Sequence, residues 1–324
     1  MSASIRPFSL AAFVAAAILA GAPGQLAAAD DYPSHNITLI IPYPAGGGVD
    51  TEGRVIAAKL TEALGQQVIV ENRPGAGAVI GVRAAAKSPA DGYTLVMLVT
   101  GMGLSPNAGY DLSKDFAPIG TIASIPIVVM ANPEVPVKSI KDVIDLAKKE
   151  PGTVTVGTPP SPTLNYFGAE NFKAITETDI TIVTYKGTGP LTNDLVGGHV
   201  KIAFNTLPPA IGNIQAGKLR AIAVAAPERI AAIPDTPTVS ESGLPGFNIV
   251  QYYGLAAPAG TPKPVIERLN AALRNIVSSE DVKQRIISDG GGPVASTPEE
   301  YAENIKHEEG QWAETIRKLG LKVE

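Results

Sequence analysis

Cysteine is absent from this chain of 324 residues, and histidine occurs only three times. Without cysteine there can be no disulfide framework, no thiolate nucleophile and no thiolate metal site. His35, His199 and His307 are far apart in the sequence, and none pairs with another at a metal-ligand spacing. No serine lies in a Gly-x-Ser-x-Gly elbow. We therefore expect no metal and no cofactor. No catalytic triad is recognisable either, although residues far apart in the sequence can still assemble a catalytic site in the fold.

An excess of positive charge is also missing. Lysine and arginine number 26 against 31 aspartate and glutamate residues, which gives a formal net charge of -5. This balance argues against nucleic acid or an anionic membrane surface as a partner. The hydrophobic fraction of 45%, with 33 glycines and 28 prolines, is typical of a well-packed α/β protein rich in turns. The length favours two domains.

The N-terminal residues form a predicted targeting segment. Arg6 supplies a positive charge, Phe8–Ala20 is apolar, and Ala27–Ala29 offers small residues for cleavage. Glycine and proline at 21–24 interrupt the apolar stretch, so a permanent membrane span is disfavoured. We expect residues 1–29 to be a cleaved signal peptide and the mature protein to begin at Asp30. In a bacterium, this places the protein in the periplasm.

The most informative stretch follows at residues 37–64. Ile37–Ile41 is a β-branched run typical of a buried strand. Gly46–Gly48 allow a sharp turn, Asp50 resembles an N-cap, and an amphipathic helix follows to Leu64. A strand, a glycine loop and a helix N-terminus together favour a small anion such as a carboxylate. A simple connector remains the alternative, and the Walker and dinucleotide patterns are both absent.

Three later loops also follow predicted strands and precede predicted helices: 157–163, 185–190 and 205–208. The carboxyl ends of strands in an open α/β sheet are where ligands bind. For each loop taken alone, a structural turn is favoured over a binding site. The recurrence of such loops at strand ends favours a binding cleft. The whole pattern predicts an α/β protein of two lobes, each a mostly parallel sheet flanked by helices. We assign the first lobe to 30–125, the second to 126–226, and a hinge return with C-terminal helices packing on the first lobe to 227–324.

Several motifs, taken in order, resemble one family. The chain is similar to the periplasmic solute-binding proteins of tripartite tricarboxylate transporters, also called the Bordetella uptake gene family. The matching stretches cover nearly all of the mature chain. They are residues 40–50 (IIPYPAGGGVD), 70–77 (VENRPGAG), 90–95 (ADGYTL), 114–118 (KDFAP), 185–187 (YKG), 217–221 (GKLRA) and 254–262 (GLAAPAGTP).

The resemblance implies a two-lobed, Venus-flytrap-like fold of the type II periplasmic-binding-protein kind, with the ligand cleft between the lobes. Its members bind small carboxylates and deliver them to a membrane permease. We expect a monomeric receptor for a di- or tricarboxylate or an aromatic carboxylate. The resemblance places the ligand-binding residues at Tyr43, Ala45, Gly46, Gly47, Gly48, Val49, Asp50, Thr100, Thr158, Pro160, Ser161, Thr163, Tyr185 and Asn205.

Three departures from the family pattern fall at the expected cleft. The first is the second-lobe loop, which carries Pro159, Pro160 and Pro162 and is followed by Tyr166 where a histidine is usual. The second is the short segment after position 100, and the third is at position 205. Asn205 replaces the usual aspartate, which would disfavour a ligand amine and suit a dicarboxylate or an aromatic carboxylate. Two other functions stay open: a periplasmic hydrolase on the same lobes, and a sensor subunit that presents the ligand to a receptor kinase.

Overall fold

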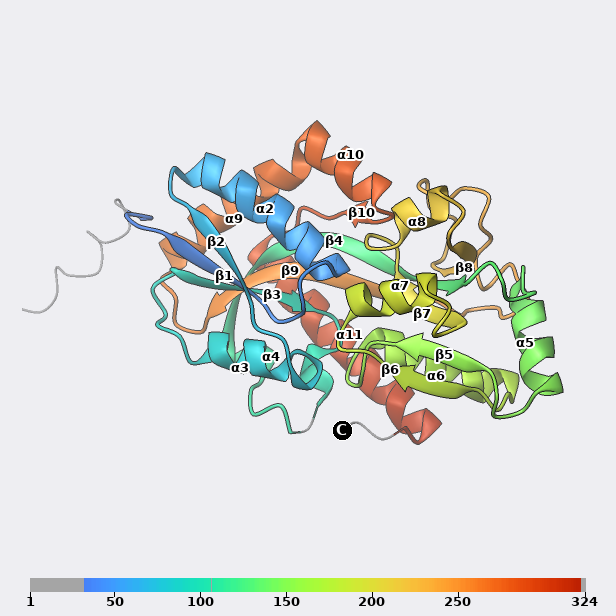
Figure 1. Ribbon diagram of the computed structural model, residues 1–324. Coiled ribbons are helices and arrows are strands. Elements are labelled where there is room, and N and C mark those ends of the chain that lie inside the picture. The colour runs from blue at the N-terminus through green and yellow to red at the C-terminus, as the bar shows by residue number, and fades with distance from the viewer. Residues whose placement is uncertain (1–31, 106, 322–324) are drawn as a thin grey trace, which may run out of the picture.

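The computed structural model describes residues 32–105 and 107–321, so the predicted signal peptide lies outside the described residues. Ten strands form a mixed sheet in the order β2-β1-β3-β9-β4-β7-β5-β6, and β8 and β10 pair with β4. Helices cover both faces of this sheet along an elongated molecule (Figure 1). No helix in the described ranges is long and apolar enough to cross a membrane.

The first lobe begins with the predicted strand–helix alternation. Strand β1 pairs in parallel with both β2 and β3, as right-handed crossovers through α2 and α3 require. Strand β9 then pairs antiparallel with β3, so this part of the sheet is mixed. The bounds are β1 Ile37–Ile41, α2 Gly48–Leu64, β2 Val68–Asn72, η1 Ala76–Ala78, α3 Val79–Ala86, β3 Thr94–Val99, η2 Met102–Leu104, α4 Leu112–Asp115 and β9 Val250–Pro258.

Strand β4 (Phe116–Ala131) runs through both lobes. The sequence predicted two separate runs, at 119–123 and 127–131, on either side of Pro126. Both runs are present and buried, but they belong to one strand, because Pro126 does not end it. Residues up to Pro126 pair with β9, whereas Ile127–Ala131 pair with β7 and β8. The proline, which lacks an N–H donor, lies where the strand exchanges one set of partners for the other.

The second lobe contains a parallel group and an antiparallel group. Strands β5, β6 and β7 are parallel, as expected. Strand β8 was expected to continue that series, but it pairs antiparallel with β4. The bounds are α5 Ile140–Lys149, β5 Thr155–Thr158, α6 Leu164–Thr176, β6 Thr181–Thr184, α7 Thr188–Val196, β7 Ile202–Thr206, α8 Ile211–Gln215 and β8 Arg220–Ala225.

Side chains of β4 alternate between two cores of the second lobe. Ile127 and Val129 enter one apolar cluster, and Val128 and Met130 enter the cluster on the opposite face. This period of two is the pleat of a strand that is buried on both sides. The first lobe has its own core, built from β1, β3, the first part of β4 and β9.

The C-terminal elements are α9 Lys263–Ser278, α10 Glu280–Ser288, β10 Gly292–Pro293 and α11 Pro298–Leu319. The sequence Thr297-Pro298-Glu299-Glu300 predicts a helix start with Thr297 as the N-cap, and the structure confirms it, since Thr297 and Glu300 form a reciprocal capping box. Helix α9 packs against α2 and β4. Helix α11 departs from the expectation that the C-terminal helices pack on the first lobe. Its Tyr301 belongs to the first-lobe core, while its Trp312 belongs to the second-lobe core.

Candidate functional site

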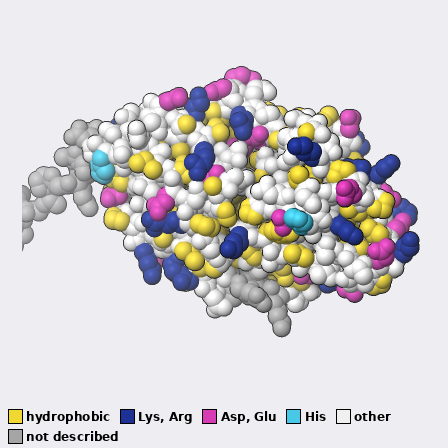
Figure 2. Space-filling view, viewed as in Figure 1, with side chains coloured by type: hydrophobic (Ala, Val, Ile, Leu, Met, Phe, Trp, Pro, Cys, Tyr) yellow, Lys and Arg dark blue, Asp and Glu magenta, His cyan; other side chains and the backbone are white. Residues whose placement is uncertain are grey.

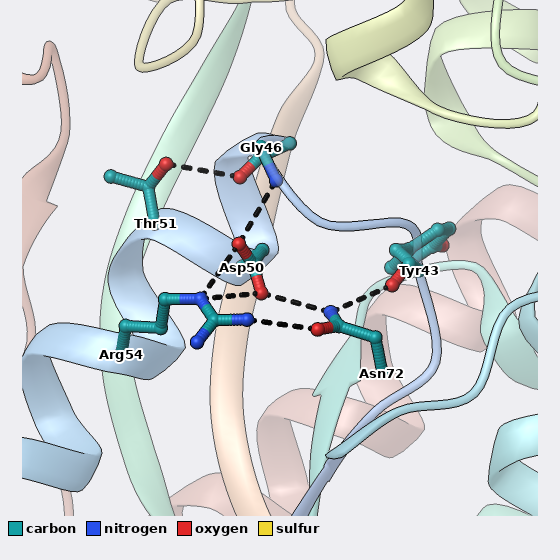
Figure 3. Close-up of polar contacts among 7 residues, drawn as sticks. Tyr43, Gly46, Asp50, Thr51, Arg54 and Asn72 are labelled. Atoms are coloured by element: carbon teal, nitrogen blue, oxygen red, sulfur yellow. Dashed lines mark hydrogen bonds and ion pairs between the residues drawn. The ribbon is translucent and has the colours of Figure 1, made fainter. Parts of the chain in front are cut away.

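The loop between β1 and α2 is held by Asp50. We expected Asp50 to be the N-cap of α2, but the N-cap is Gly47 and Asp50 lies inside the first turn. Its carboxylate folds back and accepts hydrogen bonds from the Gly46 backbone N–H (2.9 Å), Asn72 Nδ2 (2.8 Å) and Arg54 Nε (3.0 Å). Asn72 Nδ2 also donates to the Tyr43 carbonyl at 3.0 Å. Figure 3 shows how this network fixes both ends of the loop.

The electrostatic state of Asp50 follows from these contacts. Burial alone would favour the neutral acid, but hydrogen bonds from Arg54, Gly46 and Asn72 outweigh it and hold the pKa of Asp50 below its usual value. Asp50 therefore stays ionised at neutral pH. Its role in the structure is to shape the loop, because it is not among the residues that line the pocket described next.

Three helix N-termini meet at one pocket between the lobes. Helix α2 contributes Gly47 and Val49, α6 contributes its N-cap Thr163 and the next two residues, and α7 contributes Gly187 and Thr188. The first N–H groups of a helix have no partner within it and carry partial positive charge. The N-terminal ends of α2 and α7 face each other near the middle of the molecule (Figure 1). This arrangement suits a small anion.

The rest of the pocket combines apolar and polar side chains and is uncharged. Its remaining walls are formed by Tyr43, Pro44, Val99, Thr100, Pro159, Gln251 and Tyr253. Gln251 Nε2 donates to Asn165 Oδ1, and Asn165 Nδ2 donates to the Phe204 carbonyl, so these amides are oriented by their neighbours. None of the described residues that line the pocket is a lysine, arginine, histidine, aspartate or glutamate. The cavity measures about 20 Å³.

The two lobes touch at the rim of this pocket. The Gly48 backbone N–H donates to Thr188 Oγ1 at 3.1 Å, across the cleft. A Cβ atom on Gly47 would lie 2.8 Å from Thr188 Oγ1, and one on Gly189 would lie 3.0 Å from the Gly46 carbonyl carbon. At a second contact between the lobes, a Cβ on Gly77 would lie 2.6 Å from the Ser161 carbonyl oxygen. The cleft is therefore closed, and glycines permit the approach.

The structure brings five of the fourteen predicted site residues into the pocket wall: Tyr43, Gly47, Val49, Thr100 and Thr163. Ala45 and Gly46 are exposed, whereas Gly48 and Asp50 are buried beside the loop. Thr158 is fully buried, and its Oγ1 has no hydrogen-bond partner in the part of the chain that the structure describes.

The remaining predicted residues lie outside the pocket wall. Pro160 and Ser161 line a groove outside the pocket. Tyr185 packs against the core of the second lobe.

Asn205 also lies behind the pocket wall. It is fully buried, and its Nδ2 donates to Thr192 Oγ1 at 2.9 Å and to the Thr188 carbonyl at 3.4 Å. Its Oδ1 accepts from the Thr206 backbone N–H at 2.8 Å. We expected the side chain at position 205 to act directly on the charge of a ligand. In the structure it does not line the pocket, and its amide is bonded to α7 and to the next residue instead. Asn205 holds the first turn of α7 in place.

Sequence reasoning did not select nine residues of the pocket wall: Pro44, Val99, Pro159, Leu164, Asn165, Gly187, Thr188, Gln251 and Tyr253. Two of them could have been identified from the sequence, because Leu164 and Asn165 directly follow Thr163, the predicted site residue that caps the helix. Gln251 and Tyr253 have no such local signal. They reach the site because β9 pairs with β3 and β4, which are remote in the sequence.

Two α/β lobes that close on a pocket of helix N-termini define a receptor of the periplasmic-binding-protein class. The chain belongs to the tripartite tricarboxylate transporter receptor family, whose model matches residues 53–321. Protein BugT of Bordetella pertussis is 35% identical over 301 residues, covering 91% of this chain and 92% of that protein.

Two solved structures from Rhodopseudomonas palustris share the fold. The structure of Rpa4515 with adipate gives a TM-score of 0.87 at 30% identity, covering 90% of this chain and 99% of that chain. The structure of MatC with bound malate gives a TM-score of 0.83 at 30% identity, covering 88% of this chain and 100% of that chain.

Proposed function

We propose that this protein is a periplasmic receptor that binds a small organic carboxylate between its lobes and delivers it to the permease of a tripartite transporter. The observation that carries this proposal is the meeting of three helix N-termini in an uncharged, closed pocket. Adipate and malate in the two R. palustris structures support a carboxylate ligand. Family membership supports the transporter as the partner and a receptor rather than an enzyme.

In the proposed mechanism, the carboxylate supplies the negative charge at which the three helices point. Free N–H groups of α2, on the first lobe, and of α6 and α7, on the second, bind it from both sides. A ligand that contacts both lobes stabilises the closed form relative to the open form and shifts the population towards it. The permease then recognises the closed, loaded receptor.

The test is calorimetric titration of the mature protein, residues 30–324, with adipate, malate, adipamide and dimethyl adipate. We expect at least one of the two acids to bind and the uncharged analogues to bind much more weakly. A thermal shift should accompany binding, because a ligand at a hundredfold excess over its Kd stabilises the folded state by about 2.7 kcal/mol. Equal affinity for an acid and its diamide would contradict the proposal, as would turnover of the bound acid.

A further inference from the structure

A groove lies directly outside the pocket, at the mouth of the closed cleft. We call it the outer groove. It is lined by Pro42, Tyr43, Pro44, Pro74, Val79, Ile80, Arg83, Pro160 and Lys186, with the 75–78 backbone, Ser105, Asn107 and Ser161 completing its walls. Its volume is about 710 Å³, against about 20 Å³ for the pocket. The pocket offers room for little more than one water molecule, whereas the outer groove can hold most of a metabolite.

The outer groove begins where the pocket ends. Tyr43 and Pro44 line both spaces. On the second lobe, Pro159 lines the pocket and the adjacent Pro160 lines the groove. A molecule whose carboxylate lies at the helix N-termini can therefore extend past Tyr43 into the groove if it is larger than its head group.

The chemistry of the outer groove differs from that of the surrounding surface. Acidic and basic side chains are interspersed over the visible face of the molecule (Figure 2). The described groove residues instead combine prolines, Val79 and Ile80 with two cations and no carboxylate. Ile80 is 55% exposed, so its side chain is accessible to an apolar group that enters the groove.

The two cations stand on opposite sides of the outer groove, one on each lobe. Arg83 is held by hydrogen bonds from Nε and Nη2 to the Ala108 carbonyl, at 2.9 and 2.5 Å. Lys186 is exposed and forms no ion pair within the described ranges. An anionic group in the groove would therefore meet complementary charge.

We propose that the outer groove is a second part of the ligand site and receives the body of the ligand. This inference rests on the proposed function, and it narrows the ligand class. The ligand is an elongated carboxylate with an apolar or aromatic body, whose head lies in the pocket and whose body contacts Ile80. A second carboxylate, where the ligand has one, lies near Lys186.

The apolar part of this proposal is tested with propionate and 4-phenylbutyrate, titrated into wild type, Ile80→Asp and the control Ile69→Asp. Ile69 is a suitable control because it is the same residue type and is 47% exposed, close to the value for Ile80, but does not line the groove. In wild type, 4-phenylbutyrate should bind more tightly than propionate. Ile80→Asp should weaken 4-phenylbutyrate by about tenfold and leave propionate unchanged, because only the larger acid buries apolar surface there. The control should match wild type for both acids.

The charged part is tested with hexanoate and adipate, which share a six-carbon chain and differ by one carboxylate. Lys186→Gln should weaken the binding of adipate by about fivefold to tenfold more than that of hexanoate. Only adipate has a second carboxylate, which loses its cationic partner in this variant. Lys218→Gln is the control, since Lys218 is exposed and is not a groove residue. Circular dichroism of each variant verifies the fold.

The outcomes separate the two proposals. If wild type binds neither malate nor any carboxylate of the two series, the proposed function fails and the groove proposal fails with it. If malate binds but no acid of the two series does, the proposed function stands and the groove proposal fails. If the acids bind but Ile80→Asp retains wild-type affinity for 4-phenylbutyrate, the proposed function stands and the outer groove is not part of the site. Propionate binding as tightly as 4-phenylbutyrate in wild type would lead to the same conclusion.

Discussion

At the scale of single residues, two buried acids on α2 behave in opposite ways. Asp50 is ionised because three partners donate to it. Glu52 is fully buried, and neither of its carboxylate oxygens has a hydrogen-bond partner in the described structure. Burial, reinforced by the nearby Asp289, raises the pKa of Glu52 to about 7, while Arg285 acts in the opposite direction. Between about pH 4.5 and about pH 7, Glu52 is therefore protonated in the folded protein and ionised in the unfolded chain.

This difference predicts the pH dependence of a Glu52→Gln variant. Since the folded-state pKa is raised, the contribution of Glu52 to the free energy of unfolding falls as the pH rises from about 4.5 to about 7. Glutamine does not titrate, so the variant should be more stable than wild type at about pH 8, by up to roughly 3 kcal/mol, with a smaller gain at about pH 5. Urea unfolding at both pH values measures this gain. Glu303→Gln, an exposed position, should show none, and an equal gain for Glu52→Gln at both pH values would contradict the argument.

At the scale of elements, local sequence patterns predicted where strands and helices begin and end, but not which strands pair. The bounds of β1, the C-terminal end of α2 at Leu64 and the capping of α11 followed from β-branched runs, helical periodicity and cap residues. The continuity of β4 through Pro126 and the antiparallel pairing of β8 did not, because each depends on partners far away in the chain. The antiparallel placement of β9 escaped prediction for the same reason.

The candidate site was predictable to the same extent. Loops that lead into helices could be identified, and from them Tyr43, Gly47 and Thr163 reach the pocket wall. Asn205 did not, because successive side chains of a strand point to opposite faces. Asn205 faces α7, while the next residue, Thr206, lies on the side of Gly48, where an added Cβ would come within 2.9 Å of its Oγ1. Sequence alone does not tell which of two neighbouring strand residues faces the cleft.

The contact between the α2 and α7 loops predicts a variant that folds but closes poorly. Gly47 has φ of -85°, so alanine can adopt its backbone conformation without strain. The only obstacle is Thr188 of the other lobe, 2.8 Å from the added Cβ. We expect Gly47→Ala to keep the thermal stability of the ligand-free protein and to weaken adipate binding by about tenfold or more, because closure must shift the α7 loop.

The control for this variant is Gly212→Ala, since a Cβ at Gly212 meets nothing within 4 Å. Calorimetry gives the affinity, and small-angle X-ray scattering of the adipate-saturated protein gives the compactness. Gly47→Ala should remain more expanded than the control. An affinity and a radius of gyration equal to those of wild type would show that the observed approach of the loops is not needed for binding.

At the scale of the whole molecule, three connections link the lobes. Strand β4 crosses at Pro126–Ile127, and the chain crosses again at Ile249–Val250, where Ile249 bonds to both Ala225 and Ile127. Helix α11 is the third connection, with residues in both lobe cores. In the proposed mechanism, opening must therefore use the two strand crossings as hinges, and α11 or its packing must change with it. This restricts the relative motion of the lobes to rotations about the two crossings.

The uncharged pocket wall has a consequence for the medium in which the receptor operates. Dissolved ions screen exposed charges, but the field in this pocket comes from peptide groups fixed inside the closed cleft. Raising KCl from roughly 0.05 to 0.5 M should change hexanoate affinity by less than about twofold, whereas adipate, which in our proposal also meets the exposed Lys186, should bind more weakly. Calorimetry at several salt concentrations measures both. A steep loss for hexanoate would mean that surface cations hold the head group; a flat response would mean that ligand capture is independent of external salinity.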